Sequence, residues 1–355
     1  MDHPDRSDTV TGLPSPLVPS RRALLLASLG LVLCGGAPRA QEARYLRIAT
    51  GSAAGTYFPV GETMARLLSH PPGLPACDVG APCGVPGLVA TAETSQGSVD
   101  NVQAVASRAV ETALAQADVV ALAHAGKLFP DRPPLDNLRV IANLYRESMH
   151  LVARRDAGIA TVKDLAGKRV SLDRAGSGTR GDALMILKAH GVSPKKLTEV
   201  ELGPSQAADA LVSGEIDAFF FLGGVPAAGI ADIAPERRIV LIPINGPARD
   251  RLLAEGRFFM AGFIPSGAYP TVMATETVDV GAQWICAAEA AEPLIYDITR
   301  TLFAPENAAS LAAGHPRAAA ISLAGATAGI AVPLHPGAAR FYQEKGIELP
   351  VTGPI

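Results

Sequence analysis

Two short stretches of the chain place glycine and hydroxyl residues where a helix is expected to begin. They are GSAAGTYFPVG at positions 51–61 and AGSGT at positions 175–179. The first N–H groups of a helix lack internal partners and lie at the positive end of its dipole, so a carboxylate there gains several hydrogen bonds at once. The residues that would approach or bind such an anion are Gly55, Thr56, Ser177, Gly178 and Thr179. The two stretches together predict an anion clamp.

A third stretch, QGSVDN at positions 96–101, offers Ser98 and Asn101 at another expected helix start. The alternative for each stretch is ordinary helix capping, because Ser, Thr and Asn occupy helix starts in any protein. Capping is the better interpretation of one such turn alone. Two matched turns in separate parts of the chain favour anion binding instead.

The apolar pattern around these turns alternates between strand and helix. It predicts strands at 44–50, 87–94, 118–124, 168–172 and 216–222, and a long extended segment at 138–155. It predicts helices at 60–70, 98–116, 161–167, 181–191 and 205–214. Helical crossovers between strands imply parallel sheets with ligand sites at the carboxyl ends of the strands. The expected fold class is therefore α/β.

Two pairs of segments are built alike. Residues 47–68 and 169–187 each run from an arginine and an aliphatic strand through a Ser/Gly turn to Gly-Thr and a helix. Residues 111–122 and 208–221 each read as an alanine-rich helix followed by a strand. The correspondence predicts two lobes of similar construction, whose Gly-Thr turns face each other across a cleft.

Length, composition and charge agree with this picture and exclude one class of partner. A chain of 355 residues is long enough for two lobes, and 48% hydrophobic residues with only 5% aromatics suit an α/β protein. The formal net charge is −3, and no cluster of Lys and Arg stands out beyond the N-terminal arginine pair. A nucleic-acid groove therefore has no electrostatic basis.

Residues 1–40 have the order of a secretory signal peptide. Arg21 and Arg22 precede an apolar run at 23–33, which is too short to span a bilayer, and small residues follow as far as Ala40. We place cleavage after Ala40 or a few residues to either side. The arginine pair suits the general secretion route and also the twin-arginine route. A lipoprotein signal would have a small residue directly before its cysteine, but Leu33 stands directly before Cys34. A soluble periplasmic protein is therefore expected rather than a lipoprotein.

The cysteines fit an oxidising compartment. Cys77 and Cys83 flank a short Gly/Pro-rich loop and are expected to form a disulfide, with two free thiols as the alternative. A zinc site at this loop would need two further ligands, and the neighbouring sequence suggests none. Cys286 lies in an apolar stretch and is expected to be an inert buried thiol.

The ordered set of motifs resembles the TAXI-type solute receptors of TRAP transporters. The resemblance covers residues 44–346 and is carried by GSAAGTYFPVG, TSQGSVDNVQAV, LYRESMHLVARRDAGIATVKDLAGKRVSL, AGSGT and PLHPGAARFYQEKG. It implies a type II periplasmic binding protein fold, in which two α/β lobes joined by hinge strands close on one ligand. Lobe I would comprise residues 41–148 and 262–355, and lobe II residues 149–261. The cargo would be a small organic acid, such as glutamate, glutamine or 2-oxoglutarate, handed to a sodium-coupled membrane permease.

The resemblance also implies a set of ligand-binding residues. These are Gly55, Thr56 and Tyr57 in the first turn, Ser98 and Asn101 in the third stretch, Ser177, Gly178 and Thr179 in the second lobe, and Phe221 and Gly223 along the cleft wall. Arg180 either pairs with a second carboxylate of the ligand or is a solvated arginine of the first helical turn. The first turn reads SAAG where family members often carry more glycine, which leaves the identity of the ligand open.

Five further residues near the expected cleft need separate interpretations. Asp118 and Asp217 open predicted strands, where an aspartate most often accepts from backbone N–H groups, so we interpret both as structural. In the extended segment, strand alternation places Tyr145 and Glu147 on one face and His150 on the other. We expect His150 to be structural.

The sequence favours a binding protein over an enzyme. The seven histidines are scattered, and neither an HExxH motif nor a G-x-S-x-G elbow occurs. His335 is expected to cap the last helix. We expect no cofactor and no metal. The alternatives are a periplasmic sensing module that reports to a receptor kinase and, less favoured, an enzyme on the same fold.

Overall fold

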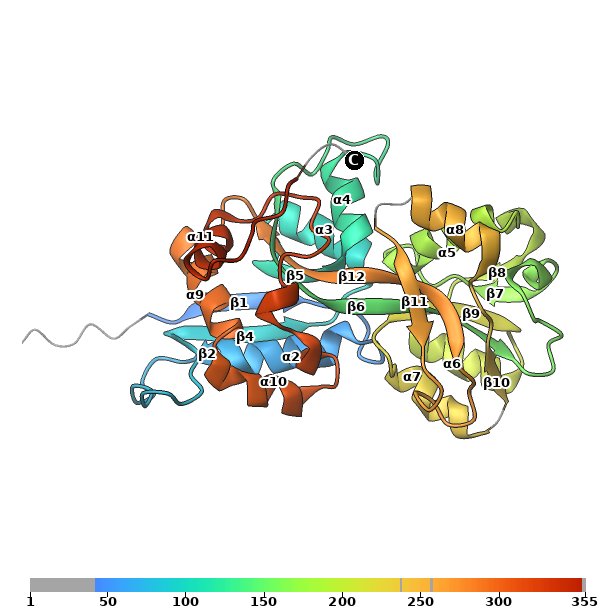
Figure 1. Ribbon diagram of the computed structural model, residues 1–355, viewed down its shortest axis with the longest axis horizontal. Coiled ribbons are helices and arrows are strands. Elements are labelled where there is room, and N and C mark those ends of the chain that lie inside the picture. The colour runs from blue at the N-terminus through green and yellow to red at the C-terminus, as the bar shows by residue number, and fades with distance from the viewer. Residues whose placement is uncertain (1–41, 237, 256–257, 353–355) are drawn as a thin grey trace, which may run out of the picture. The chain divides into compact units, whose positions relative to one another are not determined.

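The computed structural model describes residues 42–236, 238–255 and 258–352. The predicted signal peptide at 1–40 lies outside the described residues. Within these ranges no helix is both long and apolar enough to cross a membrane. The described chain contains two α/β lobes, and a single sheet of twelve strands runs through both of them (Figure 1).

Lobe I consists of the first five strands, the three helices that alternate with them along the chain, and three helices near the C-terminus. Its strands are β1 (Arg44–Ala49), β2 (Ser69–His70), β3 (Val85–Pro86), β4 (Leu88–Glu93) and β5 (Thr112–Gln116). Its helices are α2 (Tyr57–Leu68), α3 (Ser98–Ala106), α4 (Ala117–His124), α9 (Glu292–Leu302), α10 (Ala308–Gly314) and α11 (Pro336–Glu344). Helices α2, α9, α10 and α11 cover one face of the sheet, and α3 and α4 cover the other (Figure 1).

Apolar side chains at helical spacing hold α2 against this sheet. Val60, Met64 and Leu68 recur every four residues, form one stripe along the helix and are fully buried.

The helix α11 is fixed at its start by His335. The Nδ1 atom of His335 accepts from the Gly337 N–H at 3.2 Å, while its Nε2 donates to the Ala290 carbonyl at 3.0 Å. The expected capping role of His335 is confirmed.

Lobe II is a smaller α/β unit. Its strands are β7 (Arg169–Ser171), β8 (Thr198–Val200), β9 (Ala218–Gly223) and β10 (Ile239–Leu241), and its helices are α5 (Gly178–Ala189), α6 (Pro204–Ser213), α7 (Ala228–Ile233) and α8 (Gly246–Glu255). The predicted helix at 161–167 is a single 3-10 turn, Val162–Leu165. Helices α5 and α8 pack on one face of the sheet, and α6 and α7 pack on the other (Figure 1).

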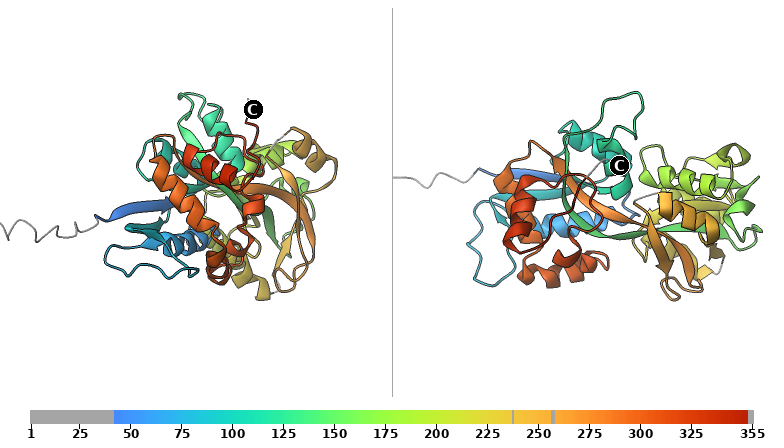
Figure 2. Two further views of the ribbon diagram at one scale, coloured as in Figure 1. Left: turned by 60° about the vertical axis from the view of Figure 1, so that its left-hand side comes forward. Right: turned by 45° about the horizontal axis from the view of Figure 1, so that its top comes forward.

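Two long strands are common to both lobes. Strand β6 (Leu138–Arg154) pairs with β12 (Thr275–Ala287) along its first half and with β9 and β10 along its second half. Strand β12 pairs with β5 at one end and with β11 (Met260–Ile264) at the other. Figure 2 shows these strands passing between the lobes in two further views. The predicted extended segment at 138–155 is confirmed, and it is the structural link between the lobes.

The sheet is mixed rather than parallel throughout. β1 pairs in parallel with β4 and β5, and β7 pairs in parallel with β8 and β9, as the crossover helices predict. The pairs made by β6 and β12 are antiparallel. The expectation of all-parallel sheets was wrong at these strands, because they reach the sheet by passing from one lobe to the other and not by a helical crossover.

The prediction was also wrong between residues 98 and 124. The expected helix at 98–116 ends at Ala106, and two residues later Arg108 takes a positive φ of 61°. Residues 112–116 form the buried strand β5. The expected strand at 118–124 is helix α4. Alanine-rich segments are compatible with either structure, and β5 forms because β1 and β12 pair with it on both sides. The correspondence of residues 111–122 with 208–221 therefore does not hold.

The predicted disulfide between Cys77 and Cys83 is present, with their Cα atoms 5.9 Å apart, and Cys286 is a buried free thiol as expected. The loop between the two bonded cysteines is mostly exposed. His70, which the sequence analysis did not connect with this pair, lies beside it, with one of its ring nitrogens within 4.8 Å of both sulfur atoms. Thiolates are the form of cysteine that binds metal, so the bonded sulfurs do not bind zinc.

Replacing both bonded cysteines, Cys77→Ser and Cys83→Ser, should lower the free energy of unfolding by about 2 kcal/mol, because the loop is no longer closed in the unfolded chain. Urea denaturation of the variant and the oxidised parent measures the difference. Equal free energies of unfolding would show that closing this loop does not measurably restrict the unfolded chain. Ligand binding should be unchanged, since neither cysteine lines the cavity described below.

Candidate functional site

Helix starts from both lobes converge on one small cavity. Its volume is about 50 Å³, which is room for a few water molecules. Lobe I contributes the residues at the starts of α2 and α3, and lobe II contributes those at the starts of α5 and α6. Of the predicted ligand-binding residues, those that line the cavity are Gly55, Thr56, Tyr57, Ser98, Ser177, Gly178, Thr179 and Phe221.

Hydrogen bonds across the cavity join the two lobes. The N–H groups of Val99 and Asp100, at the start of α3, donate to the Gly176 carbonyl of lobe II at 3.1 and 3.3 Å. Thr56 Oγ1 of lobe I accepts from the Gly224 N–H at 2.8 Å. Part of the polar capacity of the helix starts is therefore used by the opposite lobe, and a ligand that enters between the lobes competes with these bonds.

Glu147 is the most perturbed acid of the cavity wall. It is buried on β6 and accepts a hydrogen bond of 2.6 Å from the Tyr57 hydroxyl. Burial raises the pKa of Glu147 from 4.5 to about 8, and the bond from Tyr57 offsets only part of that rise. The carboxyl group is therefore protonated at neutral pH. Strand alternation had placed Glu147 on the same face as Tyr145, but the sequence did not indicate the change in its pKa.

Asp173 is the second acid of the wall, and the sequence analysis missed it. It lies between β7 and α5 and accepts a hydrogen bond of 2.8 Å from the Ser177 hydroxyl, whose oxygen in turn accepts from the Thr179 N–H at 3.2 Å. Burial raises the pKa of Asp173 to about 6, although the bond from Ser177 opposes the rise. Its place in LDRAGSGT, directly before the predicted turn, is the signal that could have found it.

A pair of buried aspartates lies beside the cavity and connects the lobes. Asp118 is in the first turn of α4, and Asp182 is on α5. Burial raises the pKa of Asp118 to about 6, while backbone N–H groups of its own helix lower it. Burial and the proximity of Asp118 raise the pKa of Asp182 well above its usual value. One proton shared by the pair removes the repulsion of two buried carboxylates.

The remaining residues interpreted as structural keep that role. Asp217 binds the Arg169 guanidinium at 2.7 Å and lies 3.7 Å from that of Arg154. His150 is fully buried, its Nε2 lies 2.8 Å from the Tyr269 hydroxyl oxygen, and burial lowers its pKa to about 4, so the ring is neutral. Tyr145 is buried but does not line the cavity.

Three predicted binding residues lie away from the cavity wall. Asn101 is fully buried, and its Nδ2 donates to the carbonyls of Thr50 and Leu114, at 2.6 and 2.7 Å, where it ties β1 to β5. Arg180 forms an ion pair of 2.6 Å with Glu199. Gly223 lies behind Phe221, where a Cβ atom would collide with the phenylalanine ring. The structure places none of the three where it touches the cavity.

The described residues that line the cavity carry an unusual set of charges. They include the acids Glu147 and Asp173 and neither Lys nor Arg. A bound anion would therefore rely on backbone N–H groups and hydroxyls rather than on a basic side chain. A donor group on the ligand would find acceptors on the two carboxyl groups.

Comparison with known proteins assigns the family. The model of the NMT1-like family matches residues 48–346, which is most of the chain. The chain belongs to the NMT1-like family. The matched range contains every residue of the cavity wall and both strands that the lobes share.

Several solved structures are similar to this member of the family at low sequence identity. MatC from Rhodopseudomonas palustris with bound malate is 17% identical, with 85% of this chain and 96% of that chain covered and a TM-score of 0.48. The periplasmic aliphatic sulphonate binding protein SsuA from Escherichia coli is 13% identical, with 84% and 83% covered and a TM-score of 0.37. The ligand-binding component of an ABC-type import system from Staphylococcus aureus is 12% identical, with 87% and 94% covered and a TM-score of 0.46.

The raised pKa of Glu147 predicts a pH dependence of stability. Between its ordinary pKa of 4.5 and its folded value of about 8, the folded protein binds a proton that the unfolded chain releases. The free energy of unfolding therefore falls as the pH rises through this range, by at most about 1.4 kcal/mol per pH unit for this one group. Glu147→Gln keeps an acceptor for the Tyr57 hydroxyl but cannot ionise, so its stability should fall less steeply.

Urea denaturation at several pH values within this range measures both slopes. The exposed Glu62→Gln gives the effect of the same substitution at the surface. Identical slopes in the parent and in Glu147→Gln would assign the pH dependence to the other buried acids and not to Glu147.

Proposed function

We propose that the chain is a periplasmic solute-binding protein, whose two lobes close on a small organic molecule that it delivers to a membrane permease. The observation that carries the proposal is the convergence of helix starts from both lobes on one buried polar cavity. Such an arrangement binds only when both lobes contribute, and it therefore couples ligand capture to the separation of the lobes. The shared strands β6 and β12 are where the chain would bend.

The lining groups favour a carboxylate that also carries hydrogen-bond donors. The starts of α2 and α5 supply N–H groups and hydroxyls for the carboxylate. Glu147 and Asp173 supply acceptors for a donor such as an ammonium or amide group. Glutamate and glutamine have both kinds of group, whereas 2-oxoglutarate has only the first. We therefore place glutamate and glutamine first among the expected ligands.

The size of the cavity requires the lobes to separate for loading. A volume of about 50 Å³ is smaller than an amino acid needs, and the Val99, Asp100 and Thr56 hydrogen bonds already join the lobes. A ligand would enter between separated lobes and then replace part of these bonds with its own. The free energy of binding would then be the free energy gained from ligand contacts less that of the lobe contacts that are lost.

The motif resemblance supports the choice of partner. TAXI-type receptors serve TRAP permeases, and the predicted signal peptide and the Cys77–Cys83 disulfide suit a periplasmic partner of such a permease. The family match is to the NMT1-like family as a whole, so the TRAP-type permease is the finer part of the proposal.

Thermal unfolding in the presence of candidate ligands tests the proposed cargo. The protein is first unfolded and refolded to remove any bound molecule. Ligand present at about 100 times its dissociation constant should add about 2.7 kcal/mol to the free energy of unfolding and raise the melting temperature. We expect glutamate or glutamine to do so and neutral sugars to have no effect. A response to sugars but not to carboxylates would refute the proposed ligand class.

A matched pair of glycine variants tests the position of the site. In Gly178→Ala the new Cβ atom would collide with the side-chain amide of Gln116 in the opposite lobe, so this side chain would have to shift and the cavity wall would change. In Gly181→Ala, three residues further along α5, the new Cβ atom would meet nothing within 4 Å. Gly178→Ala should weaken binding of the ligand by roughly tenfold or more, and Gly181→Ala should not. Equal affinities, measured by calorimetry, would place the ligand elsewhere.

A further inference from the structure

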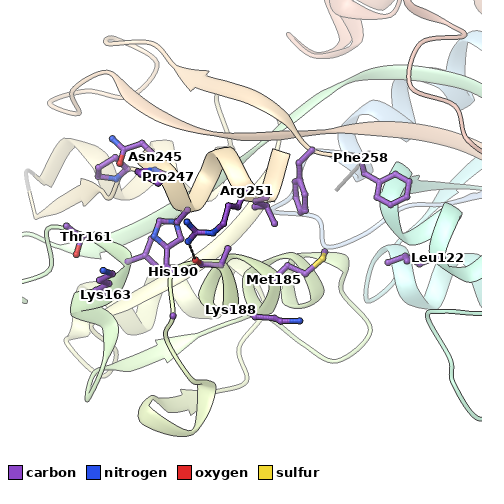
Figure 3. Close-up of a pocket in the computed structure, with 18 of the residues that line it drawn as sticks. Leu122, Thr161, Lys163, Met185, Lys188, His190, Asn245, Pro247, Arg251 and Phe258 are labelled. Carbon is purple, nitrogen blue, oxygen red and sulfur yellow. Dashed lines mark hydrogen bonds between the residues drawn. The ribbon is translucent and has the colours of Figure 1, made fainter. Parts of the chain in front are cut away.

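A second pocket, which we call the groove, lies between the two lobes and is much larger than the cavity. It has a volume of about 1150 Å³ and is lined by α4 of lobe I and by α5 and α8 of lobe II, together with Phe258 and Phe259 (Figure 3). Pockets that enclose small organic ligands typically measure about 300–1,000 Å³. None of its lining residues belongs to the cavity at the helix starts. The groove is therefore a separate place, with enough room for a ligand.

The charged side chains of the groove have one sign. Among the described residues that line it, the cations are Lys127, Lys163, Lys188 and Arg251, and there is no Asp or Glu. His190 lies among them, and its Nε2 is buried and lacks a hydrogen-bond partner. Burial lowers the pKa of His190, and the charges of Lys163 and Arg251 lower it further, which places both cations close to this ring. An anion at this point would face several donors and no carboxylate among the described lining residues.

The other end of the groove is apolar. Met185, Leu122 and Phe258 lie on the side toward lobe I, away from Lys163 and His190 (Figure 3). Phe258 packs against the part of the lobe I core that lies under α3 and α4, whereas Phe259 and Leu252 belong to the core of lobe II. An apolar body in the groove would therefore contact both lobes.

We propose that this groove is a second binding site, which takes an amphipathic organic anion. Its charged head lies among Lys163, His190 and Arg251, and its aliphatic or aromatic body extends past Met185 to Leu122 and Phe258. Arg251 is held for this contact by a hydrogen bond of 3.0 Å to the Ala189 carbonyl. The proposal is independent of the cargo in the cavity. Helix α5 nevertheless connects the two sites, since it begins at Gly178 beside the cavity and ends beside the groove.

Calorimetric titration with decanoate tests the site, because decanoate combines a carboxylate with an apolar body. Acetate has the head alone, and decanol has the body alone. We expect decanoate to bind as a single site and the other two to bind far more weakly. We also expect the titrating pKa of the His190 ring, followed by NMR, to rise when decanoate is bound, because a nearby anion stabilises the charged imidazole.

Two charge-reversal variants locate the head. Lys163→Glu with Arg251→Glu should weaken decanoate binding roughly tenfold or more. Lys195→Glu with Lys196→Glu makes the same change in net charge at exposed residues that do not line the groove, and should not weaken binding. Lys163→Gln with Arg251→Gln serves as a milder version, and circular dichroism verifies that each variant is folded.

Three outcomes would overturn the proposal. Equal binding of acetate and decanoate would exclude an apolar contact. Equal loss in both charge-reversal variants would reduce the effect to the net charge of the protein. Absence of decanoate binding to the parent protein would also refute the site and would direct attention to an acidic protein partner for the same groove.

Discussion

The antiparallel pairing of β6 with β12 is the constraint on which the rest of the structure depends. Both strands are buried along almost their whole length and carry hydrogen bonds to strands of each lobe. Because one sheet continues through both lobes, neither lobe can move without bending these two strands. The four helix starts that surround the cavity follow the carboxyl ends of β1, β4, β7 and β8, and all four strands belong to the sheet that this pair holds together.

The chemistry of the cavity depends both on the acids in its wall and on the lack of basic side chains among its described lining residues. With neither Lys nor Arg among its described lining residues, a bound anion would contact helix starts and hydroxyl groups rather than a basic side chain. The two acids of the wall differ in charge at neutral pH: Glu147, with its pKa raised to about 8, keeps its proton, whereas Asp173, with a pKa of about 6, is mostly ionised. A protonated carboxyl group can donate or accept a hydrogen bond, whereas an ionised one only accepts.

Local patterns predicted much of the fold and part of the site. Strands and helices with clear periodicity, such as β6 and α5, were predicted correctly, and the Gly-Thr turns do meet at one cavity. The alanine-rich segment around residue 114 was not, because its neighbours in the sheet and not its own propensity make it a strand. Asn101 was taken for a ligand-binding residue because a short polar side chain at a helix start looks the same whether it faces a cavity or two carbonyl groups. Asp173 and Asp182 were missed because burial, which changes their pKa, is a property of the packed lobes.

The aspartate pair between α4 and α5 would couple the proposed lobe motion to the binding of a proton. In this structure Asp118 and Asp182 are buried beside each other and retain a proton between them. Separated lobes would expose both groups to water, and each carboxyl group would recover its ordinary acidity. Each opening would therefore release the shared proton to the solvent, and each closing would take it up again. The balance between open and closed protein would then shift toward the closed form as the surroundings become more acidic.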